Sequence, residues 1–126
     1  MMGDIEWSEW YPIDLQSVTA LVPDKPGVYE VRADFEFGRL KGHSRIVTIG
    51  SANRSLRQRL IRQRFANTER FMNRAEKLLY RAGHTLEFRY ATTAGGQVAR
   101  QMEAKRLEEY EKEHWELPPG NGQLPR

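Results

Sequence analysis

The stretch Pro26-Gly27-Val28-Tyr29-Glu30-Val31 opens the part of the chain on which the other predicted elements depend. A Pro-Gly turn signal leads into an extended run over 29–37, in which apolar side chains alternate with charged ones. Because a strand places successive side chains on opposite faces, Tyr29 lies on the apolar face and Glu30 on the polar face. On this stretch alone, Tyr29 is best interpreted as a core tyrosine whose phenol needs a polar partner when buried.

Two further strands are predicted downstream. Residues 45–50 are rich in β-branched side chains and end at Gly50, and residues 85–92 alternate strictly between apolar and polar. The first two strands follow one another across a short glycine-bounded loop, so we expect them to pair as an antiparallel hairpin.

Helices are predicted where apolar residues recur every three or four positions behind a capping residue. Asp14 can cap the first of them, and either Asn53 or Ser55 can cap the second. The segment after residue 117 is rich in Pro and Gly and is not expected to form a helix. The predicted helices cover 15–21, a stretch that begins near Leu56, 68–82 and 97–114.

Length and composition restrict the class of protein. A chain of 126 residues is expected to form one domain, with residues 1–25 as an arm that packs on a domain formed by 26–126. The absence of cysteine excludes disulfides, thiol nucleophiles and zinc–thiolate sites. The N-terminus lacks the pattern of a signal peptide and no apolar run could cross a bilayer, so we expect a cytoplasmic protein.

The net charge of +3 is distributed unevenly along the chain. Residues 39–92 contain 13 basic and 3 acidic residues, and most of the basic ones are arginines, whose planar guanidinium suits phosphate. An ordinary solvated basic surface would account for this excess, but a polyanion such as nucleic acid is the favoured partner. The predicted nucleic-acid-binding side chains are Arg54, Arg57, Arg62, Arg64, Arg70 and Arg74.

Glu103 falls inside the apolar arc of the helix predicted at 97–114. A carboxylate that faces the core is costly unless it is paired with a cation or bound to a metal. Arg106, three residues further on, could form a salt bridge with it. The helical pattern alone leaves the salt bridge and the metal site as equal alternatives.

Five short motifs occur along the chain in a suggestive order: Gly27-Val28-Tyr29, Ile46-Val47-Thr48-Ile49-Gly50, the Arg59-Leu60 pair after Leu56, Gln101-Met102-Glu103, and Pro118-Pro119-Gly120-Asn121. In this order, the motifs resemble the signatures of the GIY-YIG nuclease family, over about residues 26–121. The resemblance implies an α/β fold in which helices flank a small three-stranded antiparallel sheet. It also implies hydrolysis of DNA phosphodiester bonds with one divalent metal, Mg²⁺ or Mn²⁺.

The resemblance assigns a role to each matching residue. Tyr29 would orient or deprotonate the attacking water, for which a phenol with a usual pKa of about 10 needs a nearby cation. Arg59 would hold the scissile phosphate, Glu103 would bind the metal, and Asn121 would fix the geometry of the site. The substrate would be duplex or branched DNA, with a sequence specificity that is low or is supplied by a protein partner or by DNA shape.

Thr48 departs from the family pattern, because the family's second tyrosine stands at this position. Catalysis would then rely on Tyr29 alone or recruit a group such as His43, or it would be lost. The alternative function is therefore a GIY-YIG-like module that binds nucleic acid without cutting it. A further alternative is an unrelated α/β protein that binds RNA or another partner. His43 and His84 are otherwise interpreted as ordinary surface histidines.

Overall fold

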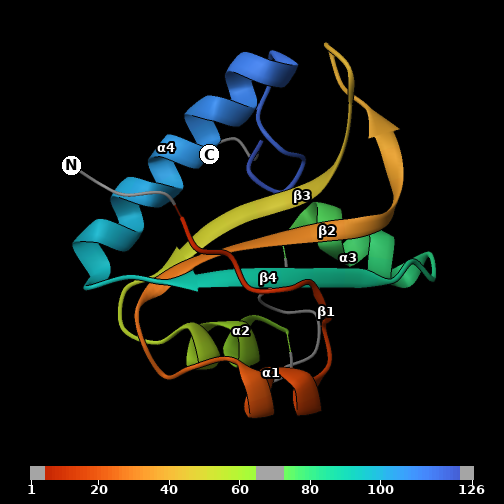
Figure 1. Ribbon diagram of the computed structural model, residues 1–126. Coiled ribbons are helices and arrows are strands. Elements are labelled where there is room, and N and C mark those ends of the chain that lie inside the picture. The colour runs from red at the N-terminus through yellow and green to blue at the C-terminus, as the bar shows by residue number, and fades with distance from the viewer. Residues whose placement is uncertain (1–4, 65–72, 123–126) are drawn as a thin grey trace.

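The computed structural model of the chain describes residues 5–64 and 73–122, and only the backbone of 62–64. The elements follow one another in the order β1–α1–β2–β3–α2–α3–β4–α4 (Figure 1). Their bounds are Tyr11–Pro12 (β1), Leu15–Leu21 (α1), Gly27–Gly38 (β2), His43–Ala52 (β3), Leu56–Arg64 (α2), Arg74–Arg81 (α3), Leu86–Thr92 (β4) and Gly96–His114 (α4).

The strands form one antiparallel sheet in the order β1-β4-β2-β3. The hairpin β2–β3 and the strand β4 confirm the three strands predicted from the sequence. The predicted count of three is wrong, however, because β1 adds a fourth strand in which Tyr11 pairs with Phe88. A two-residue strand has no periodicity of its own, and its extended form depends on pairing with β4.

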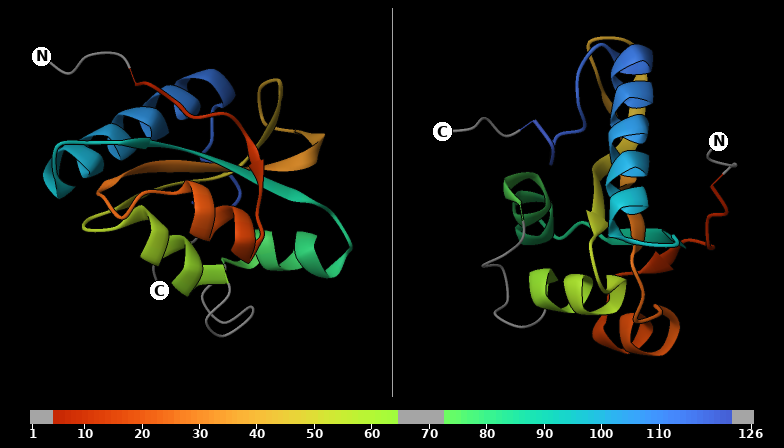
Figure 2. Two further views of the ribbon diagram at one scale, coloured as in Figure 1. Left: turned by 60° about the horizontal axis from the view of Figure 1, so that its bottom comes forward. Right: turned by 90° about the vertical axis from the view of Figure 1, so that its left-hand side faces the viewer.

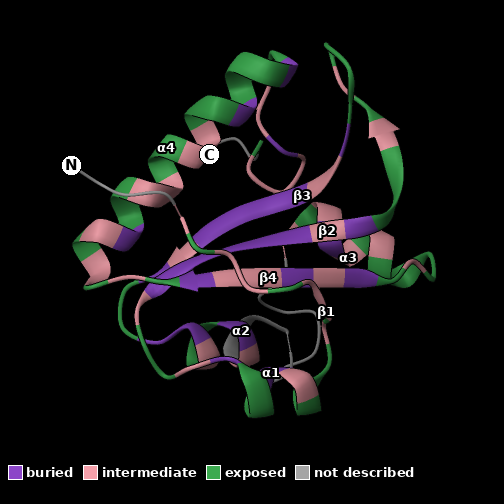
Figure 3. Ribbon diagram, viewed as in Figure 1, coloured by how far each residue is buried: buried purple, intermediate pink, exposed green. Residues whose placement is uncertain are grey.

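The sheet is covered on both faces. Figures 1 and 2 show α4 on one face and α1, α2 and α3 on the other. As a result, the middle of β2 and β3 is buried (Figure 3). The polar face of β2 is therefore buried at its first part, where Glu30 lies fully buried beneath α4, whereas Asp34 and Glu36 further along the same face are exposed.

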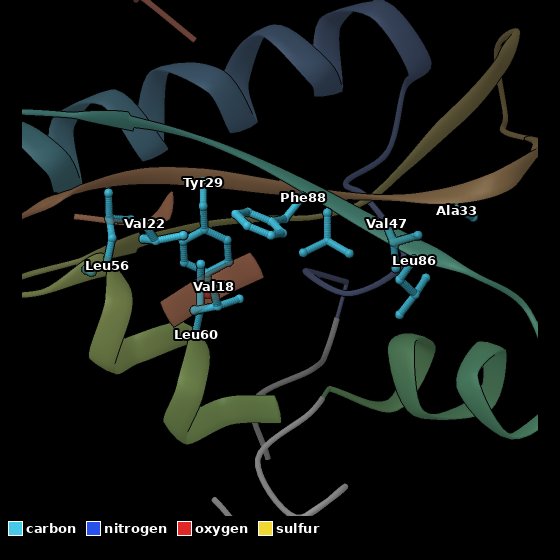
Figure 4. Packing of buried hydrophobic residues seen from close by; sticks show 11 residues of the cluster. Val18, Val22, Tyr29, Ala33, Val47, Leu56, Leu60, Leu86 and Phe88 are labelled. Carbon is cyan, nitrogen blue, oxygen red and sulfur yellow. The ribbon is translucent and has the colours of Figure 1, made fainter. Parts of the chain in front are cut away.

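The main core lies between the sheet and helices α1 and α2 (Figure 4). Phe88 from the sheet and Leu56 and Leu60 from α2 are at most 1% exposed. Burying one such large apolar side chain contributes roughly 1.5–3 kcal/mol. Tyr29 belongs to this core with 4% exposure, which confirms its interpretation as a core tyrosine. Val18 of α1 is also fully buried, so the N-terminal segment forms part of the core.

Capping residues fix where the helices begin. Asp14 accepts a hydrogen bond from the Ser17 amide at 2.7 Å, as predicted for α1. For α2, the Ser55 hydroxyl accepts from the Gln58 amide at 3.1 Å, so Ser55 caps this helix. None of the helices in the described part of the chain combines the length and the apolar composition needed to cross a bilayer.

The helix predicted over 68–82 is shorter than expected. Asn73 has an extended backbone (φ −70°, ψ 166°) and caps α3 by accepting from the Glu76 amide at 2.9 Å. The prediction of a continuous helix through residue 73 is therefore wrong, and residues 68–72 lie outside the described residues. The cap explains the difference. An N-cap asparagine accepts a hydrogen bond from the amide three residues later and has a non-helical backbone itself, so the helix begins only at the next residue.

A buried ion network joins α4 to the sheet. Oε1 of Glu30 accepts two hydrogen bonds from Arg89 of β4, at 2.9 and 2.7 Å, and Oε2 lies 2.7 Å from Nη2 of Arg106 on α4. Burial alone would lower the pKa of Arg106, but the charges of Glu30 and Glu109 outweigh it and raise that pKa above its usual value. Arg106 therefore pairs with Glu30, and the predicted alternative of a Glu103–Arg106 salt bridge does not form.

The N-terminal segment is held against the sheet by tryptophan–arginine stacking. The Arg89 guanidinium lies 4.2 Å from the ring centroid of Trp7 and 4.8 Å from that of Trp10. Trp10 has a second cation–π contact, with the Arg32 guanidinium 4.2 Å from its ring centroid. Ser8 adds backbone pairing, because its amide donates to the Tyr90 carbonyl at 2.8 Å. Cation–π contacts and strand pairing therefore hold the segment around Trp7 and Trp10 against the sheet.

Candidate active site at the edge of the sheet

The outer edge of β3 is covered by the segment that follows α4. The Asn121 side chain accepts from the Ile49 amide and donates to the Ile49 carbonyl, both at 2.8 Å. The neighbouring Gly120 amide donates to the Val47 carbonyl at 2.7 Å. Asn121 thus satisfies the edge backbone as a paired strand would, which places its side chain at a fixed point of β3.

The phenol of Tyr29 lies against Gly50, its partner across the β2–β3 ladder. A Cβ atom added at Gly50 would lie only 2.5 Å from the Tyr29 hydroxyl oxygen. Only glycine leaves room for the ring at this position, which gives the Gly50 of the sequence motif a direct structural role. Tyr29 therefore contacts the residue that follows Ile49 on the edge strand.

Glu103 reaches the same strand from the opposite face of the sheet. The Ser51 hydroxyl donates to Oε1 of Glu103, and both residues are half-buried. Three of the predicted site residues, Asn121, Tyr29 and Glu103, therefore contact the consecutive residues Ile49, Gly50 and Ser51. They approach β3 from its edge and from its two faces, so the sheet itself separates the phenol from the carboxylate.

Glu103 has the chemistry of a hard-metal ligand. Within residues 5–64 and 73–122, no group of three or more acidic or histidine side chains gathers around one point. However, Mg²⁺ is commonly held by one or two carboxylates together with waters and substrate phosphate. The Glu103 carboxylate and the Ser51 hydroxyl supply oxygen atoms only, which fits Mg²⁺ or Mn²⁺ better than a softer metal.

The predicted phosphate-binding arginines differ in their exposure to solvent and in their hydrogen bonds within the protein. Arg54, Arg59 and Arg74 are exposed, and the Arg59 guanidinium makes no ion pair or hydrogen bond in the part of the chain that the structure describes. Arg57 is half-buried, and its Nε donates to the Val22 carbonyl at 2.8 Å. Arg57 therefore joins α2 to the end of α1. The side chains of Arg62 and Arg64, and the whole of Arg70, lie outside the described residues.

The hydroxyl of Thr48 is engaged in a buried polar cluster. It donates to Oε2 of Glu76 at 2.6 Å and accepts from Nδ2 of Asn73 at 2.8 Å. Glu76 is fully buried and Thr48 is 7% exposed. Thr48 therefore connects β3 to α3, and its oxygen does not point into solvent.

The sequence analysis did not single out Glu76 or Asn73. A signal for both was present, because Asn73-Arg74-Ala75-Glu76 is an N-cap residue followed three positions later by glutamate. That pattern indicates the first turn of a helix and would have placed the start of α3 correctly. Nothing in the pattern indicates that Thr48, 28 positions away from Glu76, completes the cluster.

Neither His43 nor His84 contacts the candidate site residues. His43 is exposed at the start of β3, where it pairs with Gly38. His84 bonds Asp34 at 2.9 Å and stacks on Phe35, with ring centroids 4.6 Å apart. The hydrogen bond from the Thr85 amide lowers the pKa of Asp34 below its usual value, and the contact with His84 lowers it further.

Comparison of the chain with models of protein families, with curated proteins and with solved structures gives no significant match.

Proposed function

We propose that this protein is a divalent-metal-dependent nuclease of the GIY-YIG type that hydrolyses phosphodiester bonds of DNA at the end of strand β3. The observation that carries the proposal is the contact of three consecutive edge-strand residues, Ile49 to Ser51, with Asn121, Tyr29 and Glu103. These three come from segments far apart in the sequence. The phenol and the carboxylate are groups that can position a water and a metal, and the Asn121 amide holds the backbone of Ile49 beside them.

Glu103 is the proposed metal ligand. One of its oxygens accepts from Ser51, and its half-buried position leaves it within reach of solvent. When bound there, Mg²⁺ or Mn²⁺ would stabilise the negative charge that develops on the leaving oxygen. Ser51 fixes the orientation of the carboxylate, as outer hydrogen bonds commonly do for metal ligands.

Tyr29 and Arg59 are proposed to act on the substrate. The phenol of Tyr29 lies at Gly50, where its hydroxyl would orient the attacking water. Arg59 is exposed on α2, and its guanidinium would neutralise charge on the oxygens of the scissile phosphate. The exposed Arg54 and Arg74 would hold the neighbouring phosphates of the backbone.

The proposal is tested by cleavage of duplex, single-stranded, flapped and branched DNA with Mg²⁺ or Mn²⁺. The test variant is Glu103→Gln, which removes the charge and keeps the size of the side chain. The control is Glu111→Gln, an exposed residue two turns further along α4. We expect Glu103→Gln to lower cleavage at least about 100-fold, in line with the loss of a metal-binding group, and Glu111→Gln to cleave as the wild type does. Equal activity in both variants would refute the metal site.

The second candidate function is binding of nucleic acid without cleavage. The observation that favours it is the hydroxyl of Thr48, whose proton is donated to Glu76 and whose oxygen accepts from Asn73, so that it is bonded within the protein. Salt-sensitive DNA binding with no cleavage product on any substrate would support this function over the nuclease. Loss of binding in Arg59→Gln would then place the binding surface on α2.

A further inference from the structure

We propose that Thr48, Asn73 and Glu76 form a buried polar lock that holds the segment 118–121, and thereby Asn121, in place on strand β3. Asn121 acts on the site through its position, so the lock residues are positioning residues. The catalytic consequence rests on the proposed nuclease function, whereas the structural consequence does not.

The hydrogen bonds within the lock are mutually consistent. Thr48 gives its single proton to Glu76, and Asn73 donates from the same amide nitrogen to Thr48 and to Glu76, both at 2.8 Å. The Asn73 oxygen accepts from the Glu76 amide at 2.9 Å. Asn73 therefore serves both α3 and β3, and the lock fixes the distance between these two elements.

Gly120 connects the lock to the chain end. A Cβ atom at Gly120 would lie 2.3 Å from the Thr48 hydroxyl oxygen and 2.6 Å from the Asn73 amide nitrogen. The backbone of Gly120 therefore packs directly against the two side chains that form the lock. Its amide bonds the Val47 carbonyl at 2.7 Å, so the segment is held both by the strand edge and by the lock.

The next residue, Asn121, then makes its two bonds to Ile49. Since a side-chain amide can bond an edge backbone only over a narrow range of positions, a shift of Gly120 removes both bonds. α3 also carries the exposed Arg74 immediately after Asn73. The lock thus links a proposed phosphate-binding helix to the edge strand of the site.

The test measures amide hydrogen exchange in Thr48→Val, which keeps the shape of the side chain and removes the hydroxyl. We expect exchange at the Gly120 and Ile49 amides to rise about tenfold, with the amides of the β2–β4 ladder unchanged. Thr48→Ser, which keeps the hydroxyl, is expected to exchange as the wild type does. Thr92→Val at an exposed position of β4 is the matched control for the substitution itself.

A second variant covers the case in which Thr48→Val does not fold. Asn73→Ser keeps a capping oxygen for α3 but removes the amide that donates to Thr48 and Glu76. We expect the same local rise at Gly120 and Ile49. Unchanged exchange at both amides in this variant, or Thr48→Ser matching Thr48→Val, would overturn the lock.

Cleavage kinetics then separate the lock from the proposed function. If the wild type cuts DNA, we expect Thr48→Val to lower kcat about tenfold with KM unchanged, because Asn121 is displaced while the arginines remain. An unchanged kcat despite faster exchange at Gly120 and Ile49 would show that the lock does not position the site. A wild type that cuts nothing refutes the nuclease, and the exchange measurements still decide whether the lock exists.

Discussion

At the scale of single residues, Thr48 has a structural role, because its hydroxyl bonds Glu76 and Asn73. The resemblance to the GIY-YIG family suggests that tyrosine at 48 would restore a second phenol. The structure predicts the reverse, because Glu76, Asn73 and the Gly120 backbone fill the space around the Thr48 oxygen. We expect Thr48→Tyr to destabilise the protein by about 1–3 kcal/mol through overpacking, and to add no cleavage activity. Urea denaturation and the DNA cleavage assay measure the two effects.

The control for Thr48→Tyr is Thr92→Tyr, at an exposed position near the end of β4. There the larger ring extends into solvent, and the stability is expected to stay within about 0.5 kcal/mol of the wild type. A Thr48→Tyr variant as stable as this control, with higher cleavage than the wild type, would contradict the packing around the lock.

The burial of Glu30 could not be predicted from the sequence pattern. Alternation along β2 placed Glu30 correctly on the polar face. Such alternation usually indicates exposure to solvent, whereas α4 covers this face at Glu30. We predict that Glu30→Gln lowers the free energy of unfolding by about 3–5 kcal/mol, because two arginines then lose the charge that binds them. Glu36→Gln, exposed on the same strand, is the control in thermal and urea denaturation. Equal stability of the two variants would show that the network contributes nothing.

At the scale of elements, local signals were sufficient for most of the secondary structure. Asp14 and Ser55 cap helices where the sequence indicated, and β2, β3 and β4 follow their alternation. The elements that local signals did not predict depend on contacts between residues that are distant in sequence. Strand β1 exists because it pairs with β4, and the start of α3 is set by Asn73, whose side chain also reaches β3.

The N-terminal segment offers a test of how much cation–π contacts contribute to stability beside strand pairing. Trp10 stacks between Arg32 and Arg89, whereas Trp115 is 63% exposed with Lys41 5.4 Å from its ring. We expect Trp10→Ala to lower the unfolding free energy by about 1–2 kcal/mol, through the loss of its stacking with two guanidiniums. Trp115→Ala is expected to change it by less than about 0.5 kcal/mol. The comparison uses denaturation followed by far-UV circular dichroism, and a larger effect at Trp115 would contradict the assignment.

At the scale of the whole molecule, the sequence motifs predicted a candidate site but not the arrangement of its residues. The motifs named Tyr29, Glu103 and Asn121, and all three contact the edge strand β3. The motifs did not reveal that Tyr29 and Glu103 approach from opposite faces. The order of residues does not tell which face of a sheet a later helix covers. The observed topology does, because α4 follows β4 across one face and α1 and α2 occupy the other.

This arrangement also separates the charges of the molecule. Exposed Arg59 and Arg74 lie on the helices of one face. On the other face, the C-terminal half of α4 from residue 107 onward exposes four glutamates, at 108, 109, 111 and 113, against the single exposed lysine Lys112. These glutamates lie in the C-terminal half of α4, beyond Glu103. They would repel a DNA duplex there, so phosphate contacts are expected on the α2 and α3 side and at the end of β3. The molecule should therefore bind DNA in one orientation.

The dependence of DNA binding on salt tests this orientation. Each phosphate contact contributes about one unit to the slope of log K against log salt concentration, so Arg59→Gln and Arg74→Gln should each reduce that slope by about one. Lys112→Gln on α4 removes the same charge from a side chain that pairs with Glu108 at 3.0 Å, and it should leave the slope unchanged. Fluorescence anisotropy with a labelled duplex at several salt concentrations gives all three slopes. If Lys112→Gln reduces the slope as much as the arginine variants do, DNA contacts the α4 side, and the proposed role of Arg59 at the scissile phosphate is wrong.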